Sequence, residues 1–546
     1  MECPAESGGK YRGVKRGDRP SIPFWTWDTA CDDALIEGFA GLRWSRDASG
    51  ARRWSVTQAR CQRWRKWVPA CAAIAVVATA SAAAGAQGVT ERLSVALKKL
   101  PDGRASAGAC VIDPERGETV FAFRADEPMT PASAGKIFVM SAAIAALGPG
   151  FSFETVLAEQ GADLVVIGAG DPGFGDPELA RTRGESVTAP LERWAETLRA
   201  RGRAAATGRF VVDDFIFDDQ PVHPTWEAAD LGRWYAAPVG GLCLNDNCVE
   251  ITLHPGDRPG AKPTWSVTPP LRDTIRLINE CKTGKGPTPL LHVDVTARGY
   301  RVTGAVSKPH TFESVATFDP TLTFVDAMRT VLARDGVAPT GDVVRRPVRR
   351  PDGSLPPDAR LLAMHRTALS EVLSRIGRNS QNLFAECLMK RLGYEWQRRQ
   401  GWTTPRGSWE SGSAAIGEAL REGGVSTGGL TVVDGSGLSR ANRCTARHLA
   451  ETLAWMSRHP QGRVLAESLA RPGEPGSLRT TMKDLAGRVR AKTGTMRGVR
   501  ALAGYVTSAS GKEYAFAVMF NDYAGSSSPY KAIEHQFCKI LAAELP

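Results

Sequence analysis

The chain has 546 residues, enough for about two to four domains. Its 42% hydrophobic and 23% charged residues are typical of a folded globular protein rather than a disordered or fibrous one. The net charge of +11 comes from scattered basic residues without zinc-finger spacing or an aromatic–basic RNA-binding signature, so we expect no nucleic-acid partner.

Residues 63–86 have the pattern of an export signal. A basic stretch (RWRK) precedes an alanine-rich apolar run, and an A-x-A cleavage pattern (AGA) ends just before Gln87. We expect residues 1–62 to be an extension that is absent from the mature protein; an uncleaved anchor behind a cytoplasmic extension is the alternative. The apolar run is short for a membrane span. We therefore expect an extracytoplasmic protein, in the periplasm or cell wall, whose membrane contact is at most peripheral.

In the remaining chain, segments with helical patterns flank a segment with strand patterns. A helix (RLSVALKKL), two alternating strands (GACVIDPERGETVFAF) and an apolar helix at 131–147 come first. Residues 151–355 then carry short strands punctuated by Gly, Pro and Asp, in one or two parts. Helical patterns resume, followed by three strands and a final helix. This order predicts one α/β domain, residues 87–150 and 356–546, interrupted by a β-rich insert at 151–355.

A lysine stands in the first turn of the apolar helix predicted at 131–147. Ser133 and Lys136 form the pattern S-x-x-K, and residues at i and i+3 of a helix share one face. A serine hydroxyl is a weak nucleophile until a base takes its proton. Burial in an apolar helix depresses the pKa of a lysine, so Lys136 could be that base. The motif alone is weak, because Ser528 and Lys531 match it as well.

A second cluster follows the insert. Ser380 and Asn382 form S-x-N at a junction between two predicted helices. There a second hydroxyl could relay a proton, and an amide could hold a substrate carbonyl. On its own this pattern is more often a helix cap.

A third cluster lies at the end of a late strand. Lys492, Thr493, Gly494 and Thr495 place a cation beside two hydroxyls, which suits the terminal carboxylate of a peptide. Gly494 would let a ligand backbone approach closely. Together the three motifs, in the order S-x-x-K, S-x-N and K-T-G, form a strong signal.

The chain resembles the serine-reactive penicillin-binding protein and β-lactamase superfamily. It looks most like the low-molecular-mass class C D-alanyl-D-alanine carboxypeptidase/endopeptidases, through stretches such as MTPASAGKIF, YAAPVGGLCLNDNCVEI, RNSQNLFAECLMKRLG and VRAKTGTMRGVRALAGYV. The resemblance covers about Gln87 to the C-terminus. It implies an α/β (α+β) domain of the DD-peptidase/β-lactamase type, an antiparallel sheet flanked by helices, with a large insert. Gln381 stands where Asp or Asn is commoner, a mild departure.

The resemblance implies catalytic roles for five side chains. Ser133 would be the acylated nucleophile and Lys136 its base. Ser380 would pass a proton to the leaving D-alanine, Asn382 would orient the acyl carbonyl, and Lys492 would set the local field.

It also implies how the substrate is held. Thr493 and Thr495 would bind the terminal carboxylate beside Gly494. Backbone N–H groups of Ser133 and Thr495 would form the oxyanion hole. Asp171, in a GDP turn, would help to recognise the side-chain end of the substrate.

The activity implied is that of a serine-type D-Ala-D-Ala carboxypeptidase, with or without DD-endopeptidase activity. It would act on peptidoglycan stem peptides through an acyl-serine, β-lactams would acylate it, and neither a metal nor an organic cofactor is required. Two alternatives stay open. A β-lactamase is disfavoured by the insert and by the lack of an obvious E-x-x-L-N element. The other is a non-catalytic wall-binding or penicillin-sensing module.

Two further patterns receive weaker interpretations. Gly168, Gly170 and Gly173 fit the dinucleotide fingerprint, but Pro172 and turn residues stand where a helix should open. Cys243 and Cys248 could pair in an oxidising compartment.

Overall fold

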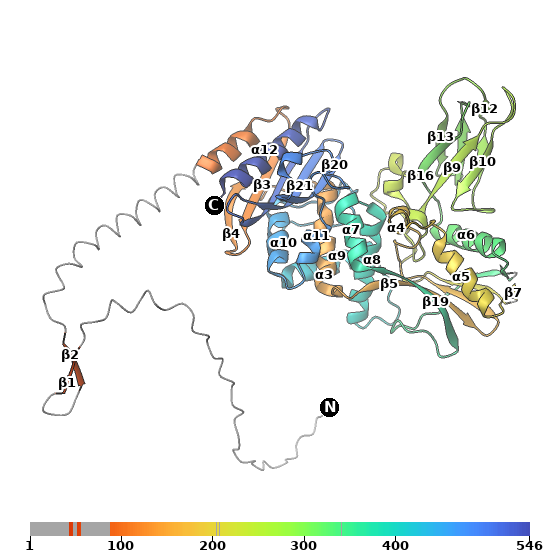
Figure 1. Ribbon diagram of the computed structural model, residues 1–546, viewed down its shortest axis with the longest axis horizontal. Coiled ribbons are helices and arrows are strands. Elements are labelled where there is room, and N and C mark those ends of the chain that lie inside the picture. The colour runs from red at the N-terminus through yellow and green to blue at the C-terminus, as the bar shows by residue number, and fades with distance from the viewer. Residues whose placement is uncertain are drawn as a thin grey trace, which may run out of the picture. The chain divides into compact units, whose positions relative to one another are not determined.

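Figure 1 shows the computed structural model, which describes residues 43–46, 52–55, 88–203, 205–206, 208–339 and 341–545. The chain divides into two units, Met1–Ala82 and Ala83–Pro546. In the first unit, β1 (Arg43–Arg46) and β2 (Arg52–Ser55) form an antiparallel hairpin. The export signal predicted at 63–86 lies outside the described residues. All candidate site residues belong to the second unit.

The second unit contains a five-stranded antiparallel sheet. Its order is β20-β21-β22-β3-β4, so two early strands join three late ones. This confirms the antiparallel sheet and the strands predicted at both ends of the chain. The strands are β3 (Ser106–Asp113), β4 (Glu118–Phe123), β20 (Val489–Met496), β21 (Val499–Thr507) and β22 (Glu513–Asn521).

Helices cover both faces of this sheet (Figure 1). A helix at 88–98 and α12 (Ser528–Glu544) pack on one face through a shared apolar core. On the other face, α10 (Ala446–Arg458) contacts β3 and β22. Behind it lie α3 (Lys136–Leu147), α7 (Leu369–Asn379), α8 (Asn382–Arg399), α9 (Trp409–Glu422) and α11 (Arg463–Ser468).

The apolar helix predicted at 131–147 is split in two. Residues 132–135 form a 3₁₀ turn, η3 (Ala132–Gly135), and α3 begins at Lys136. Side chains at i and i+3 eclipse in a 3₁₀ turn, which brings Ser133 and Lys136 together. The sequence pattern could not distinguish the two helix types. Residues Lys136 to Ile144 of α3 are buried on all sides, as the unbroken apolar run predicts.

The first part of the insert is a mixed sheet, in the order β18-β8-β6-β5-β19, with helices packed against it. We expected a β-rich insert of short strands at 151–355, so the three helices are a difference. The last strand of this sheet, residues 359–368, also lies beyond the predicted end of the insert. Asp176 and Asp319 cap two of them, each followed by a proline at the first helical position. The strands are β5 (Ser152–Gln160), β6 (Asp163–Ile167), β8 (Phe210–Asp213), β18 (Val343–Arg345) and β19 (Ala359–Ala368); the helices are α4 (Pro177–Arg183), α5 (Ala189–Ala200) and α6 (Pro320–Arg334).

The second part of the insert consists of small sheets. One has the order β10-β9-β16 and another β11-β14-β13. Their strands are β9 (Cys248–His254), β10 (Thr264–Thr268), β16 (His310–Ala316), β11 (Leu277–Asn279), β13 (Leu290–Asp294) and β14 (Gly299–Thr303). Within the described ranges of the chain, no helix combines the length and the hydropathy that a membrane span requires.

Candidate active site

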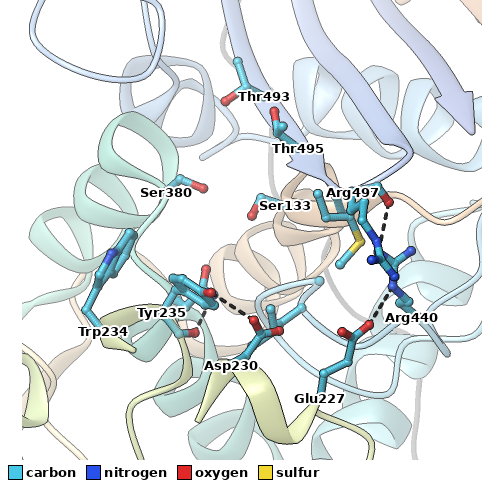
Figure 2. Close-up of a pocket in the computed structure, with 15 residues that line it drawn as sticks. Ser133, Glu227, Asp230, Trp234, Tyr235, Ser380, Arg440, Thr493, Thr495 and Arg497 are labelled. Carbon is cyan, nitrogen blue, oxygen red and sulfur yellow. Dashed lines mark hydrogen bonds and ion pairs between the residues drawn. The ribbon is translucent and has the colours of Figure 1, made fainter. Parts of the chain in front are cut away.

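The three predicted motifs meet at one cleft, with a volume of about 520 Å³. Ser133 from η3, Ser380 and Asn382 from the α7–α8 turn, and Thr493 and Thr495 from β20 line it. Figure 2 shows the hydroxyls of Ser133 and Ser380 facing the same open space. The chain therefore brings together residues that lie more than two hundred positions apart.

Lys136 is fully buried behind Ser133. Its Nζ lies 3.0 Å from Ser133 Oγ, 2.7 Å from Asn382 Oδ1 and 2.6 Å from the backbone oxygen of Ser436. Two of these three neighbours are carbonyl oxygens, which can only accept hydrogen bonds, whereas the serine hydroxyl can also donate one. A neutral amine would thus place its two N–H bonds on the carbonyl oxygens and its lone pair on the Ser133 hydroxyl.

The surroundings of Lys136 favour this neutral form. Burial lowers the pKa of Lys136 to about 7, although Glu386 and Asp434 oppose the shift with their negative charges. A substantial fraction of the amine is then neutral near neutral pH. The predicted proton acceptor has both the geometry and the basicity that the role requires.

The S-x-N motif occupies the sharp turn between α7 and α8. Ser380 ends α7 in the left-handed region, with φ of 62°, and Asn382 begins α8. Such a conformation is costly for a residue other than glycine and is often found at functional sites. Lys492 Nζ donates a hydrogen bond to Ser380 Oγ at 2.8 Å. The turn thus presents a hydroxyl to one lysine and an amide oxygen to the other.

β20 lies directly against η3. A Cβ atom on Gly494 would lie 2.5 Å from the backbone oxygen of Pro131 and 3.0 Å from Ala134 N. Only glycine permits this approach, which brings Thr493 and Thr495 alongside Ser133. Burial lowers the pKa of Lys492 well below its usual value, and the charges of Lys136 and Arg500 add to the effect.

The insert supplies one wall of the cleft. Glu227, Asp230, Trp234 and Tyr235 line it, opposite the β20 residues (Figure 2). Tyr235 donates a hydrogen bond to Asp230 through its hydroxyl, and Arg440 pairs with Glu227. Sequence analysis did not identify these residues, because no motif marks a cleft wall contributed from a separate part of the chain.

The insert also holds the S-x-N turn in place. Asn382 Nδ2 donates to the backbone oxygen of Tyr235 at 2.7 Å, and Gln381 Nε2 donates to Asp246 Oδ2 at 2.7 Å. Arg375, on α7, pairs with the buried Asp176 at 2.7 Å. Gln381, the departure noted in the sequence, thus bonds to the insert rather than to the cleft.

Asp171 is not brought to the cleft, contrary to the role implied for it. Its side chain is completely buried, accepts a hydrogen bond from the backbone N–H of Gly173, and lies 3.9 Å from His365 Nε2. Burial raises the pKa of Asp171 to about 7. A group enclosed in this way has no direct access to a ligand in the cleft, to whose lining the insert contributes the carboxylates of Glu227 and Asp230.

A buried layer beneath the cleft was missed by the sequence analysis. Glu386 of α8 accepts hydrogen bonds from the backbone N–H groups of Gly435 and Ser436. Asp434 accepts from the backbone N–H groups of Gly437 and Ser439. The available signal in the sequence was the stretch DGSGLS, residues 434–439. Its backbone rather than its serine hydroxyls contacts Lys136.

Two other interpretations can be compared with the structure. All seven cysteines of the described ranges are free and buried, and Cys243 Sγ lies 3.8 Å from Cys387 Sγ. The pairing considered for Cys243 and Cys248 is not formed. Among the described residues, no group of three or more His, Cys, Asp or Glu side chains is placed to hold a metal ion.

Comparisons with known proteins identify the family and the fold of the chain. The model of the D-Ala-D-Ala carboxypeptidase 3 (S13) family matches residues 89–544. A D-alanyl-D-alanine carboxypeptidase from an Actinomadura species is 31% identical over 453 residues, which cover 77% of this chain and 78% of the relative. The crystal structure of penicillin binding protein 4 (dacB) from Haemophilus influenzae matches with a TM-score of 0.68 and 24% identity, over 83% of this chain and 99% of that one. The same protein complexed with a novel β-lactam matches with a TM-score of 0.64 and 22% identity over the same shares.

Proposed function

The chain belongs to the D-Ala-D-Ala carboxypeptidase 3 (S13) family, and from this premise we propose how its own residues perform the reaction. It is a serine-type D-Ala-D-Ala carboxypeptidase, a penicillin-binding hydrolase that acts in peptidoglycan metabolism. Stem peptides that end in D-Ala-D-Ala are its proposed substrates, and β-lactams are its proposed acylating inhibitors.

Ser133 attacks the carbonyl carbon of the penultimate D-alanine. Lys136 takes the proton of the hydroxyl as the new C–O bond forms. The hydrogen bonding of Lys136 carries this assignment, because two fixed carbonyl acceptors leave its lone pair directed at Ser133. Backbone N–H groups of Ser133 and Thr495 would stabilise the oxyanion.

Ser380 returns the proton to the leaving amine. Its hydroxyl bonds to Lys492, whose buried nitrogen can exchange a proton with it. Asn382 orients the acyl carbonyl, and Thr493 and Thr495, beside Gly494, bind the terminal carboxylate. D-alanine departs, and water then hydrolyses the Ser133 ester to release the shortened peptide.

A D-alanine release assay tests these roles. The full chain should release D-alanine from a peptide ending in D-Ala-D-Ala, and Ser133→Ala should release none. An active Ser133→Ala variant would contradict the assignment. A cross-linked stem-peptide dimer in the same assay reports DD-endopeptidase activity, and repeated turnover of a β-lactam would instead indicate a β-lactamase.

We also propose that the protein is exported to the periplasm or cell wall. The basic, apolar and A-x-A segments of residues 63–86 support this. N-terminal peptide mapping of the exported protein should find Gln87 as the first residue, and an intact segment 63–86 would contradict cleavage.

A further inference from the structure

We propose that Glu386 is a positioning residue that controls the orientation and protonation of Lys136 through the loop 434–439. This inference rests on the roles proposed above for Ser133 and Lys136. Glu386 is absent from the lining of the cleft in the described part of the chain, so it would act through other groups rather than on the substrate.

Hydrogen bonds connect the two side chains through one residue. Glu386 Oε1 accepts from the backbone N–H of Ser436 at 2.8 Å, and the carbonyl oxygen of that same residue accepts from Lys136 Nζ at 2.6 Å. Glu386 Oε2 accepts from Gly435 N at 2.9 Å and from Trp409 Nε1 at 2.7 Å. Three donors therefore converge on one carboxylate with no exposed surface.

The same helix fixes the second acceptor of the amine. Asn382 lies one helical turn before Glu386 on α8, and its Oδ1 accepts from Lys136. α8 thus sets both carbonyl oxygens that orient Lys136, one directly and one through the loop. A shift of the Ser436 carbonyl would let the amine rotate its lone pair away from Ser133.

The charge of Glu386 acts on the same amine. Burial raises the pKa of Glu386 to about 7, and the ionised carboxylate favours the protonated form of Lys136 and so opposes the effect of burial on the amine. Asp434 acts in the same direction and keeps its own donors, including Trp226 Nε1 at 2.9 Å. Further ionisable groups near Lys136 or Glu386 are Lys492 of β20 and Cys387 and Lys390 of α8. In the insert, Asp218 lies near Lys390, and His223 lies near Asp434 and Lys390.

The test is the pH dependence of acylation by a chromogenic β-lactam. Glu386→Gln keeps the size of the side chain and removes its charge. The acidic limb of the rate should move to lower pH by about one unit, since the amine loses a neighbouring anion. The maximal rate should also fall, because one amide oxygen replaces a carboxylate that serves three donors.

Asp326→Asn is the matched control. Asp326 is also a buried carboxylate that accepts backbone N–H groups, from Arg272, Asp273 and Thr274, but it lies in the insert away from the cleft. This variant should leave the acidic limb in place. If the loss of any buried charge moved the acidic limb, that limb would move in Asp326→Asn as well as in Glu386→Gln.

An acidic limb that stays in place in folded Glu386→Gln would overturn the inference, even if the rate falls. A wild-type chain that the β-lactam does not acylate would instead overturn the proposed function. If Glu386→Gln does not fold, Glu386→Asp provides the test. It keeps the charge but is one methylene shorter, so the limb should stay and the rate should fall at least tenfold; a rate equal to wild type would overturn the inference.

Discussion

Two lysines without solvent access each contact a serine that lines the cleft. Lys136 contacts Ser133, and Lys492 contacts Ser380. Burial lowers the pKa of both amines, and the charge of Lys136 lowers the pKa of Lys492 further. Both amines of the site are therefore easier to deprotonate than lysines on a protein surface.

The first prediction concerns pH. Only the neutral amine of Lys136 can accept a proton, and its pKa is about 7. Protonation should therefore remove activity as the pH falls through about 7, at about tenfold per pH unit below it. The rate of β-lactam acylation against pH measures this limb. A rate that keeps rising up to pH 10 would show that Lys136 titrates like an ordinary lysine.

Replacement of Lys136 by arginine tests the same role chemically. An arginine stays protonated at any working pH and cannot accept the serine proton. Lys136→Arg should lower the acylation rate by roughly 10²–10⁴-fold. Lys531→Arg is the matched control, because Lys531 is exposed and belongs to the second S-x-x-K pattern, on α12. Equal rates in the two variants would exclude Lys136 as the base.

Among the individual residues of the site, the sequence motifs predicted those that contribute a side chain. Ser133, Lys136, Ser380, Asn382 and Lys492 lie together as the three motifs predict. The backbone oxygen of Ser436 could not be predicted, because a main-chain acceptor leaves no mark on residue type. Glu386 was missed for a related reason: its partners lie about fifty residues away on a loop.

At the scale of elements, the cleft depends on how closely β20 approaches η3. Gly494→Ala would place a methyl group against the backbone of Pro131 and Ala134. The strand must move away, so we expect a loss of about 1–3 kcal/mol in the free energy of unfolding and much slower acylation. Urea unfolding and β-lactam acylation measure the two effects.

Gly417→Ala is the control for that substitution. Gly417 lies within α9, and nothing stands within 4 Å of the position its Cβ would take. Alanine should stabilise the helix by about 0.5–1 kcal/mol and leave acylation unchanged. A Gly494→Ala variant as stable and active as Gly417→Ala would contradict the close approach of β20.

Elements with a strong apolar periodicity were predicted from the sequence. Near the motifs, the structure changes the type and the bounds of the predicted elements. The five strands of the main sheet and helices α7 to α10 follow their apolar patterns. The turn η3 was read as part of α3, because both conformations tolerate the same residues. In the insert, the Gly and Pro punctuation around them concealed the helices α4, α5 and α6.

At the scale of the whole second unit, the insert and the catalytic helices are joined by buried polar contacts. Lys390 of α8 is fully buried, and its Nζ pairs with Asp218 of the insert at 2.6 Å. The same nitrogen lies 3.7 Å from the centroid of the Trp409 ring. The change in sequence pattern at 151–355 predicted an insert but not this attachment, because pairing between distant residues is set by the fold.

Lys390→Met tests the importance of this junction. Loss of one partner leaves a carboxylate near the interface without its cation, so we expect a loss of about 3–5 kcal/mol in the free energy of unfolding. Arg463→Met, in the exposed pair with Glu467 on α11, should cost at most about 1 kcal/mol. Urea unfolding of both variants measures the difference, and equal costs would show that the Lys390 pair is not a structural junction.

The most direct measurement is mass spectrometry of the full chain after exposure to labelled penicillin. Proteolysis of the adduct should yield one labelled peptide, with the ester on Ser133, and Lys136→Arg should carry little label after the same exposure. A label on Ser436 or Ser528, or a wild-type chain without label, would contradict catalysis by Ser133 with Lys136 as its base.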